Sequence, residues 1–355
     1  MPADRNYHIR PVLDGQTLAG ALRILITGLS WGDARRLIHN RHVQVNGNLV
    51  LDDARRIKSG DVVKVSDHAR APVPTARDVR VVHVDADLIV VDKPAGITTL
   101  RHAAEEGWDD ARKQRQPTLD EVVQAMLPAV MRDVPPPAMS PKKAAPQPDA
   151  PPGVFRRTNR ATPRPAGTVP TLRPVHRLDR DTSGLMMFAL TARAEQKLVG
   201  MFKEHAITRL YRAVVVGAVT EPLRMESWFV RDRGDGLRGS SAAGKSAPES
   251  QHAVTHVRPL KPIAGGKYSL VECQLETGRT HQIRIHLAEA GHMLCGERTY
   301  LRPAAGAPAV KDESGAPRQA LHSAECRFVH PITGQELAFS SPMAKDLAQW
   351  IERLS

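Results

Sequence analysis

The sequence predicts a mixed α/β or α+β fold in two domains, a small one followed by a larger one. Its 355 residues suffice for about two domains at roughly 150 residues per domain. Apolar residues at helical spacing and short apolar strands occur together in both parts of the chain. A stretch rich in proline and alanine, 69–78, separates the parts and is predicted to be a linker.

The bulk composition favours a cytoplasmic protein. Hydrophobic residues make up 41% of the chain, an ordinary share for a soluble globular protein. No apolar run approaches the ~20 residues that a membrane span needs, and residues 1–10 lack the apolar core of a secretory signal. The three cysteines are odd in number and far apart, which favours free thiols in a reducing compartment.

The charge points toward a polyanionic partner. Fifty Lys and Arg against 38 Asp and Glu give a formal net charge of +12. Basic side chains that neutralise phosphates release counterions, so a strong basic excess favours nucleic-acid binding. Many soluble proteins are also basic, so the motifs have to decide between the two interpretations.

Residues 15–68 are predicted to form a compact module that begins with two helices. In the first helix, leucines at helical spacing define one apolar face: Leu18, Leu22, Leu25 and Leu29. Ser30 is a suitable N-cap for the second helix, with Asp33 three residues on as a short version of the capping box. The second helix carries Arg35 and Arg36, which can stay in solvent while its apolar side packs.

A hairpin and a further strand complete the predicted module. The dipeptide at 46–47, Asn-Gly, separates two short runs and is the strongest short hairpin signal, because both turn residues need positive φ. This order of elements resembles the small S-four-type RNA-binding domain, which is named after a ribosomal protein. The resemblance implies an RNA-binding role, in which we expect Arg35 and Arg36 to contact phosphates. A helix–hairpin domain without an RNA role is the alternative.

The larger domain, predicted over 79–355, opens with two strands, 81–84 and 88–91, around a short turn. The stretch 132–174 then interrupts the pattern with 12 prolines and a net charge of +6, from eight basic and two acidic residues. Such a composition buries too little apolar surface to offset the entropy of ordering. We therefore predict a disordered basic insertion, which either contacts phosphates or is a plain solvated loop.

The chemistry is expected in a polar nonapeptide, 176–184, which reads H-R-L-D-R-D-T-S-G. The six apolar residues 185–190 follow at once and predict a buried strand. A helix over 192–205, capped by Thr191, is expected to pack against the sheet. The nonapeptide should therefore lie at the edge of a sheet core, where a loop can hold charged groups beside a pocket.

This nonapeptide resembles the signature of RluA-type pseudouridine synthases, a family that includes large-subunit ribosomal RNA pseudouridine synthases. The resemblance spans roughly 79–345 and implies a catalytic domain with a central, largely antiparallel sheet flanked by helices. Further segments resemble family motifs in family order: 91–96 (V-D-K-P-A-G), 207–214 (I-T-R-L-Y-R-A-V), 275–286 (L-E-T-G-R-T-H-Q-I-R-I-H), 321–324 (L-H-S-A) and 330–334 (H-P-I-T-G).

Carried over residue by residue, the resemblance implies that Asp179 is the catalytic aspartate. Breaking the bond between uracil and ribose is similar to glycoside cleavage, but no water needs activating, so one carboxylate suffices where a hydrolase uses two. Asp179 would attack the sugar or remove a proton from it to give a glycal, and the sequence leaves both routes open. Because reactant and product are isomers, we expect no metal, electron carrier or nucleotide cofactor.

The resemblance also implies three residues that bind the substrate. Arg284 matches the basic residue that pairs with the aspartate, and an opposite charge favours an ionised carboxylate. Tyr211 matches the tyrosine that stacks on the target base. Arg177 matches the arginine that helps to extrude the nucleotide, which is needed because the target carbon is unreachable inside a helix. Glu297 stands where the family usually has an aspartate.

Two other patterns are predicted to have no function of their own. Residues 239–246 fit the phosphate-loop pattern G-x-x-x-x-G-K-[ST] but lack the strand before it and the helix after it that such a loop needs. Six histidines and cysteines in the C-terminal part match no paired zinc-ligand spacing. They are His281, His286, His292, Cys295, His322 and Cys326. We therefore predict neither a nucleotide site nor a metal site.

The sequence thus predicts an isomerase that converts uridine to pseudouridine in structured RNA, with large-subunit ribosomal RNA as the leading substrate. A transfer-RNA substrate and a non-catalytic RNA-binding or ribosome-assembly factor are the alternatives. The presence of Asp179, Tyr211 and Arg284 favours catalysis. The expected partner is RNA, with no membrane and no cofactor, and we expect a cytoplasmic monomer.

Overall fold

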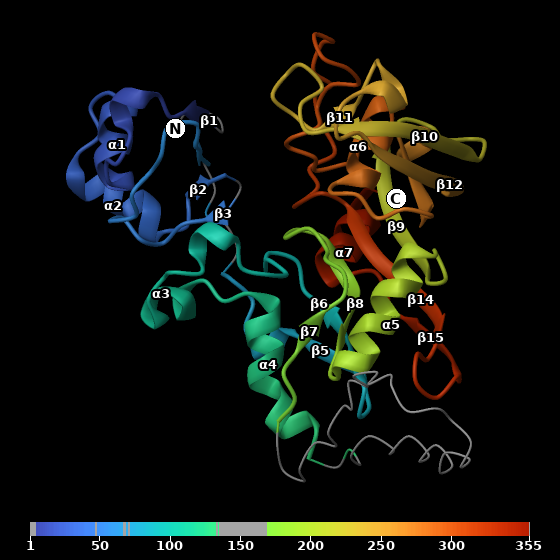
Figure 1. The fold of residues 1–355 in the computed structure, drawn as a ribbon. Coiled ribbons are helices and arrows are strands. Elements are labelled where there is room, and N and C mark those ends of the chain that lie inside the picture. The colour runs from blue at the N-terminus through green and yellow to red at the C-terminus, as the bar shows by residue number, and fades with distance from the viewer. Residues whose placement is uncertain are drawn as a thin grey trace, which may run out of the picture. The chain divides into compact units, whose positions relative to one another are not determined.

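The structure, a computed structural model, describes residues 5–46, 48–66, 69, 72–132, 134 and 169–354, and the chain divides into two compact units. The first unit comprises Met1–Pro74 with Arg101–Thr118, and the second comprises Thr75–Leu100 with Leu119–Ser355 (Figure 1). In the described part, no helix is both long and apolar enough to cross a membrane.

The first unit packs α1 and α2 with a four-stranded sheet of order β1-β4-β2-β3 around one apolar core. Thr17 and Ser30 cap the two helices, because their side chains accept hydrogen bonds from the third backbone N–H that follows. The elements are β1 (Arg5–His8), η1 (Pro11–Leu13), α1 (Leu18–Leu25), α2 (Trp31–His39), β2 (Val43–Val45), β3 (Asn48–Leu49), β4 (Val62–Val65), η3 (Ala103–Glu105) and α3 (Asp110–Arg115).

The predicted hairpin is present, but the first helix is shorter than predicted. Strands β2 and β3 pair antiparallel, with Val45 opposite Asn48, while Gly47 of the predicted turn lies outside the described residues. Helix α1 ends at Leu25, because Ile26 already has extended backbone angles (φ −117°, ψ 102°). Leu29 packs against the same core from the loop, so its helical spacing misled the prediction.

The first unit is also larger than the predicted module of 15–68. Strand β1 pairs with β4 along its whole length, so the unit begins before residue 15. The sequence of β1, Arg-Asn-Tyr-His, lacks the apolar alternation that would have predicted a strand. The segment 101–118, which we assigned to the larger domain, groups with this unit, and Gln116 donates a hydrogen bond to the carbonyl of Leu49.

The second unit is built on an 11-stranded sheet of order β11-β10-β12-β13-β9-β14-β8-β6-β5, with β15 on β14 and β7 on β8. In the described part its neighbouring strands are antiparallel except β14 and β8, which confirms the predicted, largely antiparallel sheet. The strands are β5 (Arg80–Val84), β6 (Leu88–Lys93), β7 (Arg173–Pro174), β8 (Ser183–Ala189), β9 (Thr208–Val216), β10 (Leu223–Val230), β11 (Gly239–Ser240), β12 (Gln251–Ile263), β13 (Tyr268–Leu275), β14 (Leu321–Val329) and β15 (Glu336–Ser340).

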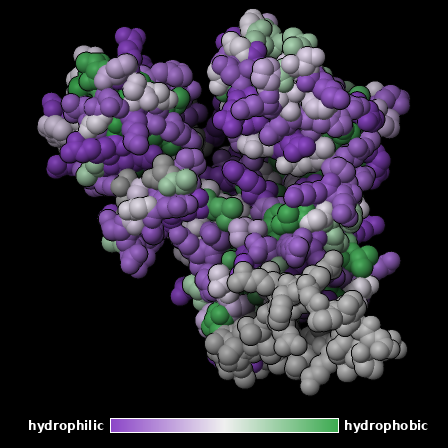
Figure 2. Space-filling view, viewed as in Figure 1, coloured by the Kyte–Doolittle hydropathy of each residue, from purple (hydrophilic) through white to green (hydrophobic). Residues whose placement is uncertain are grey.

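Helix α5 packs against this sheet as the apolar pattern predicted, and further helices belong to the same unit. In α5, Thr191 caps the N-terminus and two small or apolar residues, Ala194 and Leu198, are fully buried with the strands. On the surface, hydrophobic residues are scattered among hydrophilic ones (Figure 2). The helices and turns are η2 (Ala76–Asp78), α4 (Leu119–Val130), α5 (Ala192–Lys203), η4 (Gly244–Ser246), η5 (Ala264–Gly266), α6 (Gln282–Glu289) and α7 (Lys345–Leu354).

Strand β8 confirms the predicted buried strand, since each of its seven residues is buried. Gly184 within it has φ +110°, and a Cβ there would lie 2.2 Å from the carbonyl oxygen of Ser323 on β14, so only glycine fits. Residues 133 and 135–168 of the predicted insertion lie outside the described residues. Its last residues, 169–174, are ordered, because β7 pairs with β8 and Gln124 bonds the backbone of this segment.

Candidate active site

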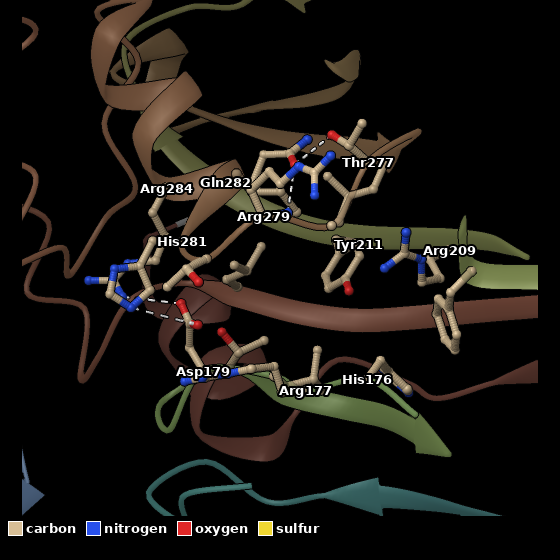
Figure 3. A pocket seen from close by; sticks show the side chains of 18 of the residues that line it. His176, Arg177, Asp179, Arg209, Tyr211, Thr277, Arg279, His281, Gln282 and Arg284 are labelled. Atoms are coloured by element: carbon tan, nitrogen blue, oxygen red, sulfur yellow. Dashed lines mark hydrogen bonds and ion pairs between the residues drawn. The ribbon is translucent and has the colours of Figure 1, made fainter. Parts of the chain in front are cut away.

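A cavity of about 460 Å³ opens beside the polar loop that precedes β8. Its walls come from residues 175–182, the end of α5, the start of β9 and the segment 275–284. Figure 3 shows side chains from these segments converging on the cavity. Four residues predicted from sequence lie together here, namely Arg177, Asp179, Tyr211 and Arg284. The other two predicted residues, Arg35 and Arg36, belong to the first unit.

Asp179 and Arg284 form an ion pair in this cavity. The Arg284 Nη1 atom donates to Oδ2 of Asp179 at 3.1 Å, and the side chains are only 10% and 18% exposed (Figure 3). Arg284 lies in the first turn of α6, and Asp179 begins a tight turn closed by the N–H of Thr182. A strand-preceding turn and a helix thus bring together two residues that are 105 positions apart.

Arg284 is fixed from its other side by Glu297. The guanidinium donates two bonds to this carboxylate, Nε to Oε2 at 2.8 Å and Nη2 to Oε1 at 2.7 Å. Glu297 also accepts the backbone N–H groups of Arg298 and Thr299. Burial alone would lower the pKa of Arg284, but the charges of Glu297 and Asp179 outweigh it and raise that pKa. The glutamate at the usual aspartate position therefore reaches its partner.

His281 and Tyr300 complete the surroundings of the pair. His281 precedes α6 with a left-handed backbone (φ 59°), and its Nδ1 atom lies 2.7 Å from the Tyr300 hydroxyl. Its Nε2 atom is 3.8 Å from Oδ1 of Asp179, too far for a hydrogen bond. Burial lowers the pKa of His281 against the opposing charge of Asp179, so the ring is neutral near pH 7. Arg284 is therefore the cation in contact with Asp179.

Tyr211 and Arg177 both line the cavity, but the first is buried and the second is exposed. Tyr211 lies on β9 and is 5% exposed, and burial raises the pKa of its hydroxyl, which stays protonated. Arg177 is exposed at the rim, and within the described residues its side chain makes no hydrogen bond or ion pair. The buried ring of Tyr211 can stack on a flat base, and the exposed guanidinium of Arg177 can contact a negatively charged strand. The pair therefore suits a site that binds a nucleotide.

Lys93 organises the loop that carries Asp179. It is fully buried at the end of β6, and its ammonium donates to the carbonyls of Pro94 (3.1 Å), Arg180 (2.9 Å) and Thr182 (2.7 Å). Burial lowers the pKa of Lys93 to about 7, despite the nearby aspartates. The lysine thus holds the loop through its backbone.

Sequence reasoning did not assign a function to His281, Glu297, Tyr300 or Lys93. Lys93 and His281 lie within segments quoted as resembling the family, and Glu297 stands where the family usually has an aspartate, so position in a family pattern was the available signal for these three. What the sequence lacked was the partner of each side chain, because the contacts join residues that are far apart along the chain.

One cluster among the described residues has the spacing of a metal site, Asp85, Asp87 and His330. The Nδ1 atom of His330 accepts the N–H groups of Ile332 and Thr333, so Nε2 carries the proton that faces Asp85 at 3.2 Å. Asp87 accepts from the hydroxyl of the helix cap at Thr191. The cluster is therefore tied into an internal hydrogen-bond network.

The stretch with the phosphate-loop pattern, 239–246, lies in the connection between β10 and β12. It contains the short strand β11 and the single turn η4, and β10 pairs with both β11 and β12. The buried strand followed by a long helix that a phosphate loop requires is not formed by these residues. The pattern is thus a coincidence of composition in a hairpin connection.

Comparison with known proteins identifies a family that this chain matches. Residues 87–289 match the family described as RNA pseudouridylate synthase. A ribosomal large subunit pseudouridine synthase D from Zymomonas mobilis is 32% identical over 339 residues, covering 94% of this chain and 92% of that protein. The protein of the same name from Vibrio cholerae is 29% identical over 347 residues, covering 94% and 90%.

Solved structures share the fold. The structure of human RNA pseudouridylate synthase domain containing 4 superposes with a TM-score of 0.52 at 19% identity, covering 78% of this chain and 92% of that chain. Human RNA pseudouridylate synthase domain containing 1 gives a TM-score of 0.50 at 19% identity, covering 80% and 97%. These likenesses concern the arrangement of the elements.

Proposed function

Since this chain belongs to the RNA pseudouridylate synthase family, we propose that it isomerises uridine to pseudouridine in large-subunit ribosomal RNA, with Asp179 as the catalytic carboxylate. The observation that carries the proposal is the ion pair between Asp179 and Arg284 in the cavity. The names of the similar bacterial proteins support ribosomal RNA as the substrate.

The reaction exchanges one bond for another within a single nucleotide. The bond from N1 of uracil to the ribose breaks, the detached uracil turns, and its carbon 5 bonds to the same sugar carbon while the proton of carbon 5 moves to nitrogen 1. Asp179 assists either by attacking the sugar or by removing a proton from it. Both routes need a carboxylate that is fixed at one position. Arg284 fixes the carboxylate of Asp179 directly, and Lys93 fixes the backbone of the loop that carries it.

The other residues of the cavity support binding of an extruded nucleotide. Tyr211 presents a buried ring on which uracil can stack, and its protonated hydroxyl can donate or accept a hydrogen bond. Arg177 at the rim can follow the displaced strand. The base has to leave its helix, because the carboxylate lies inside a cavity that a stacked base cannot enter.

The location and assembly state are part of the same proposal. We propose that the enzyme acts in the cytoplasm, where ribosomal RNA is accessible in bacteria. The described residues that line the cavity all belong to one unit of one chain, which supports action as a monomer. Arg35 and Arg36 of the first unit are proposed to contact RNA phosphates.

The test maps pseudouridines in RNA from cells that lack the gene and are complemented with wild type, Asp179→Asn or the control Asp235→Asn. The control removes an equal charge from an arginine pair outside the cavity, where Arg233 keeps Glu289 as a partner. We expect Asp179→Asn to bind RNA normally and to form no pseudouridine, while Asp235→Asn matches wild type.

Three outcomes would contradict this proposal. Asp179→Asn activity within about tenfold of wild type would exclude the carboxylate mechanism, since removing a group essential to the reaction costs orders of magnitude. A wild type that restores no pseudouridine would exclude the activity. Restoration confined to transfer RNA would replace the substrate class.

A further inference from the structure

The cavity has a second basic end, formed by Arg209 at the start of β9. Figure 3 shows Arg209 beyond Tyr211, on the side away from Asp179. The residue is 8% exposed, and its guanidinium lies 5.1 Å above the ring of Phe202. Its Nε atom is buried without a hydrogen-bond partner, and within the described residues no carboxylate pairs with this guanidinium. Arg209 is therefore a buried cation for which the described part of the chain supplies no counterion.

His176 presents a second unused donor at the same end. Its Nε2 atom accepts the N–H of Met187 at 3.0 Å, so the proton of the neutral ring is on Nδ1. That Nδ1 atom is buried and has no acceptor. Burial, and then the charge of Arg209, lower the pKa of His176 to about 3, which keeps the ring in this neutral form. The ring lies 4.9 Å from Phe202, on which Arg209 also rests.

The titratable groups around Arg209 are neutral or basic. Burial raises the pKa of the Tyr211 hydroxyl, and it raises the pKa of Cys326, opposite Arg209 on β14, to about 12. Lys203 and Arg279 add positive charge to the lining. Among the described residues that line the cavity, Asp179 is the one carboxylate, and it is held by Arg284. Nothing here balances the buried charge.

A buried cation is costly unless it is paired and hydrogen-bonded. A site that keeps one unpaired is arranged for a ligand that brings the opposite charge. We propose that Arg209 and His176 form a subsite for a phosphate group of the RNA strand next to the target uridine; the inference rests on the proposed function. The guanidinium offers planar paired donors that suit phosphate oxygens, and His176 Nδ1–H offers another.

Gly278, which also lines the cavity, allows the guanidinium of Arg209 to take its position. A Cβ at residue 278 would lie 3.1 Å from Nη1 of Arg209, tighter than ordinary contacts, and its backbone angles are ones that alanine can adopt. The absent side chain therefore leaves room for the guanidinium itself to lie close to the backbone at residue 278. Gly278→Ala offers a way to crowd Arg209 without changing any charge.

The test compares Arg209→Met with a matched control, Arg212→Met, in the full-length protein. Arg212 lies on the same strand and pairs with Glu272 and Glu325, which also have Arg258 and Arg327 as partners. The control therefore removes an equal charge without leaving a carboxylate alone. Binding to unmodified large-subunit ribosomal RNA transcribed in vitro is measured over a salt series.

We expect Arg209→Met to weaken RNA binding about tenfold and to lower the slope of log affinity against log salt by about 1, as the loss of one phosphate contact predicts. Gly278→Ala and His176→Gln should weaken binding less, about threefold each, because the charge of Arg209 remains. Without RNA, Arg209→Met should melt at or above the wild-type temperature, since it removes an unpaired buried charge. Arg212→Met should leave the affinity and the slope unchanged.

Two results would overturn the subsite. One is an Arg209→Met protein that binds RNA with the wild-type affinity and salt slope. The other is an Arg209→Met protein that melts well below wild type, because that would make the arginine a structural cation. Failure of the proposed function would give a different result. The wild type would form no pseudouridine, while Arg209→Met would still bind RNA with a smaller salt slope than wild type.

Discussion

Two buried arginines line the same cavity, and their surroundings are opposite. Arg284 donates to two carboxylates, Asp179 and Glu297, and one of these also accepts two backbone N–H groups. Arg209 has an aromatic ring beneath it and, among the residues that the structure describes, no carboxylate partner. The protein supplies the partner where a charge has to be fixed before substrate arrives. It leaves a cation unpaired where the substrate itself carries the opposite charge.

This difference has an energetic consequence that mutation can expose. Removing Arg284 leaves two buried carboxylates without their cation, whereas removing Arg209 leaves no charge behind. The same chemical change, arginine to methionine, should therefore have opposite effects on stability at the two ends of one cavity.

The largest effect is expected for Arg284→Met. The free energy of unfolding should fall by about 3 kcal/mol, the usual cost of breaking a buried ion pair, and single-turnover formation of pseudouridine should be lost. Denaturant unfolding and RNA mapping provide the two measurements. Arg209→Met is the matched control, with unchanged or higher stability. Equal destabilisation of both variants would mean that Arg209, like Arg284, stabilises the folded protein.

Lys93 is a third buried basic side chain, and backbone carbonyls instead of carboxylates accept its hydrogen bonds. Lys93→Met should lower the free energy of unfolding by about 2 kcal/mol, because buried acceptors lose their donor. The turn carrying Asp179 should loosen, so kcat should fall about 30-fold while KM changes little, as expected when a catalytic group is misplaced. Steady-state kinetics would check this, with Lys197→Met as a control on α5. A rise in KM alone would instead indicate a role in binding.

The sequence predicted several elements of the second unit and four residues that line its cavity. The buried strand β8, the helix capped by Thr191 and the convergence of Asp179, Tyr211 and Arg284 could be predicted, because each lies in a motif or a regular apolar pattern. Motifs and apolar patterns can be identified from neighbouring residues alone, without information on contacts between distant parts of the chain.

The partners of the buried charges could not be predicted in the same way. Glu297 meets Arg284 across 13 residues, and Lys93 meets the carbonyl of Thr182 across 89. Strand β1 was missed because its pairing with β4 depends on backbone bonds that its polar sequence does not signal. The unpaired state of Arg209 depends on what surrounds it in space, and no spacing along the chain reveals that.

A moderate effect is expected for Arg35 and Arg36, a third arrangement of basic residues. Both are exposed and pair with Asp53 and Asp33 at 3.1 and 3.0 Å, in surface ion pairs that RNA phosphates can replace at little cost. Replacing both by Ala should weaken RNA binding about fivefold and lower the salt slope by about 1 to 2, without changing kcat at saturating RNA. An unchanged slope would mean that the first unit does not contact RNA through this helix.

The smallest effect concerns pH and the neutral ring of His176 beside Arg209. Burial lowers the pKa of His176 to about 3, against 6.5 for an ordinary histidine. Between these values the unfolded chain binds a proton that the folded chain does not, so the free energy of unfolding falls as pH drops from 6.5 toward 3. One such group contributes at most about 1.4 kcal/mol per pH unit.

His176→Gln keeps an acceptor for Met187 but cannot titrate, so its melting temperature should depend less steeply on pH below 6.5. The exposed His8→Gln control should retain the wild-type slope, and a His176→Gln protein with that same slope would show that this ring is protonated in the folded state.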